Sequence, residues 1–208
     1  MSTKDEAQSA LRRYLVRFPG ERRRMAALKS QLGASKKSDI FCRKNMVGHI
    51  TTSAFVIDDK AGKVLLIHHK LYNRWLQPGG HYEGREALWL SALREVGEET
   101  GADKAALHNW SMTQDIPFDI DTHAITAQPK KCEGEHFHHD YVYLVSADST
   151  RPLVPQVEEV FDAKWEPLEI ILTLPGTRFK RIARKLVQCA IVNPRDYPAF
   201  AAYVPFSS

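Results

Sequence analysis

Residues 79–102, GGHYEGREALWLSALREVGEETGA, constrain this chain more than any other part of its sequence. The segment begins as a glycine-rich loop. It continues as a predicted helix over residues 87–100, because apolar residues recur there at helical spacing and a glycine follows at the usual stop position. Within that helix Glu95, Glu98 and Glu99 share one face, since each residue advances about 100° around the axis. The sequence therefore predicts a loop followed by a helix that carries three clustered carboxylates.

Carboxylates that share a helix face repel one another, by some tenths of a kcal/mol per pair on an exposed helix. A bound cation would remove this cost, and oxygen ligands of this kind suit Mg²⁺ or Mn²⁺. Mg²⁺ keeps several waters and also binds substrate phosphates, so such a site implies a phosphate-bearing substrate. Taken alone, the same residues are equally typical of a solvated acidic surface. The spacing of the surrounding residues decides between these interpretations.

A fixed pattern surrounds the glutamates. Gly80 is followed after five residues by Glu86, and after seven more by REVGEETGA at residues 94–102. This arrangement resembles the Nudix box, the signature of the Nudix hydrolase family, over residues 80–102. Ala102 stands where the family usually has a larger aliphatic residue. The resemblance covers the box and the strand order around it, and leaves the subgroup open.

The resemblance implies roles for particular residues. The Mg²⁺ ligands, with Mn²⁺ as a substitute, are expected to be Glu95, Glu98, Glu99 and the backbone carbonyl of Gly79. The catalytic set is expected to comprise Glu98, Glu95, Arg94 and Glu159. In this set Arg94 orients the glutamates, and a carboxylate takes the proton of the attacking water.

That proton acceptor varies within the family, so several acidic residues stay candidates. It is either Glu98 or an acid of a later loop, where the candidates are Glu158, Glu159, Glu133 and Glu135. Glu86, at the start of the box, is expected to be structural rather than catalytic.

The implied reaction is Mg²⁺-dependent hydrolysis of the diphosphate linkage of a nucleoside diphosphate derivative, a small-molecule substrate. Pro117 lies 16 residues after Gly101, a spacing that resembles ADP-ribose pyrophosphatases, although Phe118 replaces the glycine that often follows. This favours ADP-ribose or a nucleotide sugar. The alternatives are hydrolysis of (d)NTPs or of an RNA 5′ end, and a non-catalytic nucleotide- or RNA-binding module.

The remaining periodicities predict an α/β fold: an α/β/α sandwich with a mixed β-sheet, plus an N-terminal helical extension. Strands are expected at residues 49–58, 64–69, near 105–118, 136–145 and 160–165, and a second amphipathic helix at 178–191. The first two strands should form a hairpin around the turn DDKAGK. The apolar face of the box helix should consist of Trp89, Ala92, Leu93 and Val96.

Charge is unevenly distributed along the chain. Residues 1–45 carry 12 Lys and Arg against 4 Asp and Glu, a net charge of +8, whereas residues 46–208 carry 17 against 21, a net charge of −4. We expect residues 1–45 to form a basic helical extension outside the catalytic core, followed by the catalytic domain over 46–208. The extension is either a solvated basic surface or a site for a polyanion such as RNA. A homodimer is a further alternative for its role.

Several histidines and tryptophans have weaker signals. Cys132, His136, His138 and His139 lie close together, but their spacing is not a standard zinc pattern, so we favour a polar strand end that borders the cleft. Ordinary structural roles are expected for His49, His68, His69 and His81, although His81 lies within reach of a phosphate. Trp75 and Trp110 are expected to be core or rim aromatics rather than base-stacking residues.

The three cysteines are far apart and form no CxxC pair, which favours a reducing, cytoplasmic setting. No apolar run reaches the roughly 18 to 20 residues that span a bilayer, so we expect no membrane partner.

Overall fold

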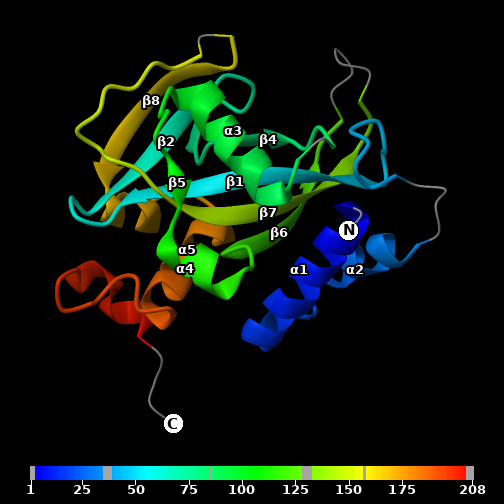
Figure 1. Ribbon diagram of the computed structural model, residues 1–208, viewed down its shortest axis with the longest axis horizontal. Helices are drawn as coiled ribbons and strands as arrows, with labels where there is room; N and C mark the ends of the chain where they lie inside the picture. The colour runs from blue at the N-terminus through cyan, green and yellow to red at the C-terminus, as the bar shows by residue number, and fades with distance from the viewer. Residues whose placement is uncertain (1–2, 35–38, 85, 128–132, 157, 205–208) are drawn as a thin grey trace.

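The computed structural model describes residues 3–34, 39–84, 86–127, 133–156 and 158–204 (Figure 1). Its strands are β1 (Gly48–Asp58), β2 (Lys63–His69), β3 (Arg74–Leu76), β4 (Gly79–His81), β5 (Ala106–Leu107), β6 (Asp119–Ile125), β7 (His136–Ser146) and β8 (Val160–Pro167). Its α-helices are α1 (Thr3–Arg17), α2 (Ala26–Gly33), α3 (Leu88–Thr100), α4 (Asn109–Gln114) and α5 (Thr177–Gln188). Short 3₁₀ helices are η1 (Pro19–Glu21), η3 (Leu168–Leu172) and η4 (Pro198–Tyr203).

The described strands form one mixed sheet built around β1. Its main order is β3-β2-β1-β7-β5, and β4, β6 and β8 pair with β1, β7 and β2 respectively. β1 runs parallel to β7 and antiparallel to β2 and β4. Almost every residue of β1 is buried, which explains its near-continuous run of β-branched and apolar residues. The predicted hairpin of β1 and β2 and the mixed sheet are confirmed.

Helices cover both faces of this sheet, with α3 on one side and α5 on the other (Figure 1). Alternate residues of β1 point to opposite faces. Val56 therefore packs in the cluster that contains Val96 of α3, and Phe55 packs against Phe179 and Ile182 of α5. This arrangement confirms the predicted α/β/α sandwich.

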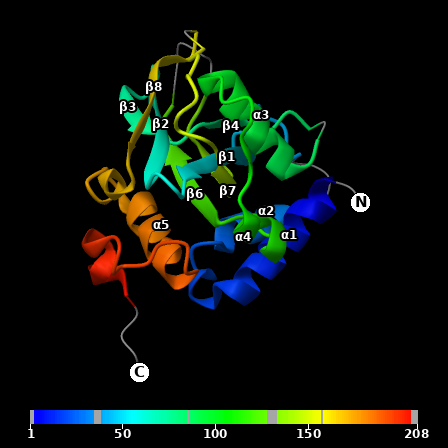
Figure 2. The same cartoon turned by 60° about the vertical axis from the view of Figure 1, so that its left-hand side comes forward.

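Helices α1 and α2 lie side by side against the body (Figures 1 and 2). Leu11 of α1 and Leu28 of α2 are buried in the same cluster as Tyr141 of β7 and Val96 of α3. The hydroxyl of Tyr141 also donates to the carbonyl of Ala7, at 3.0 Å. The boundary expected at residue 45 therefore does not separate two hydrophobic cores, because the basic helices share the core of the sheet.

A buried ionic network fastens α5 to the N-terminal helices. Lys185 of α5 lies 2.6 Å from Asp119 of β6 and 3.1 Å from Glu21 of η1, and it also donates to the hydroxyl of Tyr14 in α1. Arg181 binds both oxygens of Asp119, at 2.7 and 3.0 Å. Each buried charge therefore has an opposite charge beside it, which is what makes burial of charged groups tolerable.

The structure corrects three sequence predictions. Only Ala106–Leu107 of the strand expected near 105–118 are extended, as β5; α4 follows them, and the main strand of this region is β6 at 119–125. β3 and β4 lie in a segment predicted to be a loop. Trp89, expected in the apolar face of the box helix, is 36% exposed, and Leu88 and Ser91 are buried instead. None of the helices among the described residues is long and apolar enough to cross a membrane.

Candidate active site

The two glycines of β4 contact the carboxylates of α3 directly. The backbone N–H of Gly79 donates to Glu99 Oε2 at 2.8 Å. A Cβ atom on Gly80 would lie 2.6 Å from a carboxylate oxygen of Glu95, closer than non-bonded atoms approach. A side chain at position 80 would therefore displace the Glu95 carboxylate, and glycine leaves that carboxylate its place beside β4.

Helix α3 is fixed at both ends. Ala87 at its start offers no side-chain acceptor, and the free N–H of Leu88 instead donates to the carboxylate of Glu6 in α1, at 3.0 Å. A carboxylate at this end also complements the helix dipole. At the other end Gly101 has φ of 70°, a left-handed conformation that suits glycine, and its N–H caps the carbonyl of Gly97.

Arg94 holds three carboxylates at once. Its guanidinium lies 3.0 Å from Glu86, 3.0 Å from Glu95 and 2.6 Å from Glu98. These three bonds fix the side chains of the acidic face before any ligand binds. Glu99 is held instead by the backbone of β4, through the hydrogen bond from Gly79.

The carboxylates differ in burial. Glu98 has a side chain that is 49% exposed, whereas Glu99 is 1% exposed, which corrects the expectation of a solvent-facing position for Glu99. Burial raises the pKa of Glu99 to about 8; the Gly79 N–H opposes this shift and the charge of Glu95 adds to it. Burial likewise raises the pKa of Glu95 to about 7, against the opposing charge of Arg94.

Glu159, in the loop before β8, is close enough for its charge to raise the pKa of both Glu95 and Glu99. The structure thus brings together Glu95, Glu98, Glu99 and Glu159, with Arg94 beside them. Glu133 lies elsewhere: it pairs with Arg43 at 3.4 Å and acts on the pKa of His49 and His81.

This donor set fits a hard divalent cation. Two of the carboxylates are buried, they repel each other and their neighbours, and a cation placed among them would favour their charged forms. Their oxygen atoms are the ligands that Mg²⁺ and Mn²⁺ prefer. The residues that could hold such an ion are Glu95, Glu98, Glu99 and the carbonyl of Gly79.

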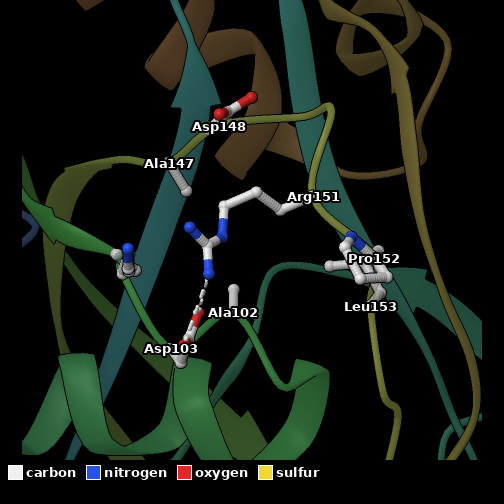
Figure 3. A pocket seen from close by; sticks show the side chains of 9 residues that line it. Ala102, Asp103, Ala147, Asp148, Arg151, Pro152 and Leu153 are labelled. Atoms are coloured by element: carbon white, nitrogen blue, oxygen red, sulfur yellow. Dashed lines mark hydrogen bonds and ion pairs between the residues drawn. The ribbon is translucent and has the colours of Figure 1, made fainter.

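A small hollow near the end of α3 is not part of this site (Figure 3). It is lined by residues 102–105, 147–148 and 151–153, and the guanidinium of Arg151 closes it by pairing with Asp103 at 3.1 Å. Its volume is about 10 Å³, the lower limit for a single water molecule. A nucleotide does not fit there.

Pro117, whose spacing from the box resembles ADP-ribose pyrophosphatases, does not line an exposed loop. It is buried between α4 and β6, and the next residue, Phe118, packs in the cluster of α5. Trp110 of α4 is a core aromatic that contacts both hydrophobic clusters, and Trp75 of β3 stacks on His68 with ring centroids 5.0 Å apart.

The histidines are placed differently from the sequence prediction. His136 and His138 share a face of β7, as expected, with their Nε2 atoms 3.2 Å apart. His139 points the other way and lies 3.0 Å from Gln31 of α2. His49 and His81, predicted to be ordinary residues, lie against His138. Cys132 lies outside the described residues.

Residues 48–187 match the family model of the NUDIX domain. The chain belongs to the Nudix family. A Nudix protein of Arabidopsis thaliana, "Nudix hydrolase 6", is 24% identical over 172 residues, which are 79% of this chain and 56% of that protein. "Phosphatase NudJ" of Escherichia coli K12 is 26% identical over 140 residues, covering 66% of this chain and 80% of NudJ. The predicted family membership is therefore confirmed.

Solved Nudix structures share the fold. A hydrolase of the NUDIX family from Clostridium perfringens has a TM-score of 0.50 and 24% identity, and covers 68% of this chain and 97% of its own. The Ap4A hydrolase of C. elegans, in a binary complex, has a TM-score of 0.50 and 18% identity, with 68% and 96% covered. The chain spans little more than half the length of the Arabidopsis relative, and α1 and α2 lie outside the residues matched by the family model.

Proposed function

We propose that this Nudix protein is a Mg²⁺-dependent pyrophosphohydrolase that cleaves the diphosphate linkage of a nucleoside diphosphate derivative. The observation that carries the proposal is the pair of buried carboxylates, of which Glu99 is held by the N–H of Gly79 and Glu95 by Arg94. A structural role gives no reason to bury two mutually repelling carboxylates with a single guanidinium nearby. A cation that arrives with a phosphate-bearing substrate does give one.

The proposed reaction assigns different roles to the glutamates and to Arg94. Glu95 and Glu99, with Glu98 and the Gly79 carbonyl, would hold the ion, which when bound stabilises charge on the phosphoryl oxygens. Arg94 keeps the carboxylates oriented through its bonds to Glu95 and Glu98. These side chains are positioned before substrate binds, so little reorganisation is needed in the reaction.

We assign the acceptor of the water's proton to Glu159. The competing candidate, Glu98, is held by Arg94 at 2.6 Å, and a carboxylate paired with a guanidinium is a weaker base. Glu159 is exposed in the loop before β8. The backbone of this loop contacts α3, since the N–H of Gln156 donates to the carbonyl of Glu99 at 3.4 Å, and the charge of Glu159 raises the pKa of Glu95 and Glu99.

Among nucleoside diphosphate derivatives we propose ADP-ribose or a nucleotide sugar. Support for this choice comes from the spacing of Pro117 from the box alone, because Pro117 itself is buried. Triphosphates and RNA 5′ ends are the competing substrates, and both are included in the experiment below.

The experiment compares kcat/KM with Mg²⁺ for ADP-ribose, UDP-glucose, the common NTPs and dNTPs, and 5′-triphosphate RNA. We expect the sugar derivatives to be preferred by at least about tenfold, roughly 1.4 kcal/mol in the barrier. A tenfold preference for any triphosphate would move the assignment to that substrate. Absence of hydrolysis across the panel, with Mg²⁺ bound, would favour a non-catalytic module.

The role of Glu159 is tested with Glu159→Gln and the matched neighbour Glu158→Gln. Loss of a general base typically costs about 10²- to 10⁴-fold in rate. We expect Glu159→Gln to lower kcat within that range with little change in KM, and Glu158→Gln to retain wild-type kcat. Equal kcat values for the two variants would return the role to Glu98.

A further inference from the structure

Three histidines from three neighbouring strands meet on the sheet face opposite the carboxylates. The strand register pairs His49 of β1 with His138 of β7, and Thr51 of β1 with His81 of β4. Because residues 49 and 51 lie on the same face of β1, all three imidazoles project to one side. Gly80, which pairs with Thr52, faces the other side and contacts Glu95. The backbone of β4 therefore separates the histidines from the acidic site.

These imidazoles are close enough to share one ion. Each residue offers a ring nitrogen, and the three nitrogens lie within 4.8 Å of one another. The ring centroid of His49 is 4.7 Å from that of His138 and 5.1 Å from that of His81. A common ion with Zn–N bonds of about 2.0–2.1 Å requires nitrogen separations near 3.4 Å, which small rotations of the rings would reach.

A ring nitrogen of His49 is buried without a partner. His49 is 1% exposed, and its Nδ1 lies 3.3 Å from the carbonyl oxygen of Asn45. A carbonyl only accepts, so Nδ1 carries the proton and Nε2 presents a lone pair. Among the described residues this Nε2 has no hydrogen-bond partner. A backbone carbonyl that fixes the tautomer and directs the other nitrogen inward is the usual arrangement around a metal-binding histidine.

A fourth imidazole lies beside these three. Nδ1 of His136 is 2.7 Å from the carbonyl oxygen of Gly134, so its Nε2 also presents a lone pair, at 3.2 Å from Nε2 of His138. This separation is close to the edge of a tetrahedron of Zn–N bonds. The nearby ion pair of Arg43 and Glu133 contributes no net charge that would repel a cation.

We propose that His49, His81 and His138 bind one transition-metal ion of the class that prefers imidazole, with Zn²⁺ as the ion tested. Imidazole nitrogen suits Zn²⁺, Cu²⁺ and Ni²⁺, whereas Mg²⁺ prefers oxygen. The two faces of the sheet would thus select different cations. The bound ion would tie β4 to β1 and β7, and so stabilise the strand that carries the glycine pair.

The experiment titrates ZnCl₂ by calorimetry into metal-free full-length protein in excess Mg²⁺. The variants are His81→Asn and His138→Asn, with His68→Asn as control because His68 stacks on Trp75 in another part of the sheet. We expect one equivalent of Zn²⁺ to bind wild type and the control alike, and at least tenfold weaker binding in both variants. Thermal melts should show Zn²⁺ raising the Tm of wild type and the control only.

Melts without metal establish which variants fold, and if His138→Asn does not fold, the half-buried His81→Asn decides. The proposal is overturned if wild type binds no Zn²⁺, or if His81→Asn binds it as tightly as wild type. It is also overturned if Glu99→Gln abolishes binding while the histidine variants retain it, since the ion then occupies the acidic site.

Discussion

Truncation of Leu28 in α2 tests whether the basic N-terminal helices belong to the folded body. Leu28 is fully buried, in the cluster that also holds Tyr141 and Val96. A Leu→Ala change at such a site costs about 2–5 kcal/mol, from lost burial and the cavity left behind. That is a large part of a typical total of about 5–15 kcal/mol. We therefore expect Leu28→Ala to destabilise the whole protein.

The assay is equilibrium unfolding in urea, followed by both circular dichroism and tryptophan fluorescence. With a slope of about 1–3 kcal/mol per molar urea, a loss of about 3 kcal/mol lowers the midpoint by roughly 1–3 M. All four tryptophans of the chain lie beyond residue 45, so fluorescence reports the body, while circular dichroism includes α1 and α2. Val16→Ala in α1 is the control, because Val16 is 80% exposed and its loss should cost no more than about 0.5 kcal/mol.

Two results would refute this reasoning. Equal shifts of the midpoint in Leu28→Ala and Val16→Ala would mean that α2 is not packed as described. A helical signal of Leu28→Ala that is lost at lower urea than the tryptophan fluorescence signal would mean that the helices form a separable unit. If the reasoning holds, removal of residues 1–33 should abolish activity, because it exposes the core and removes the carboxylate at the start of α3.

Three further predictions follow from the site and its supports. Glu99→Gln should lower Mg²⁺-dependent kcat/KM by about 100-fold or more, roughly 2.7 kcal/mol. It should not lower stability in metal-free buffer at pH 7, because the pKa of about 8 keeps Glu99 protonated there. A folded variant with wild-type turnover at saturating Mg²⁺ would contradict the metal assignment. Glu6→Ala should cost about 0.5–2 kcal/mol in urea unfolding, the usual value of a helix cap, because the N–H of Leu88 loses its acceptor, and an unchanged midpoint would exclude that role. Burial alone would raise the pKa of Asp119, but the charges of Lys185 and Arg181 hold that pKa well below its usual range. The stability that ionised Asp119 contributes is therefore present above about pH 4 and is lost as the pH falls further. A urea midpoint that does not change between pH 6 and pH 3 would contradict this prediction.

The acidic face could be predicted because helix geometry is local. The spacing of Glu95, Glu98 and Glu99 fixes their common face whatever surrounds the helix. Their burial could not be predicted, because it depends on how closely β4 approaches α3, and β4 is a three-residue strand inside a glycine-rich segment. Strands of this length carry no periodicity that a sequence pattern could reveal.

The supports of the site come from distant parts of the chain. Glu6 caps Leu88 across 82 residues, and no pattern in the charged N-terminal segment distinguishes Glu6 from an ordinary acid of a first helical turn. The high charge of this segment favoured a solvated extension, whereas its interspersed apolar residues decide the packing. The histidines likewise share no linear spacing, because strand register alone brings His49 and His81 together.

The register of β4 on β1 controls both faces of the sheet. The pairing of Gly80 with Thr52 places a residue without a side chain beside Glu95. The pairing of His81 with Thr51 places an imidazole beside His49. Because side chains alternate along a strand, a slip of one residue would turn His81 into the space beside Glu95 and remove it from the histidine cluster. The parallel pairing of β1 with β7 fixes β1 itself, so the acidic site depends on long-range strand pairing as much as on its own glutamates. The box supplies the reactive groups, and the sheet determines which groups are brought together.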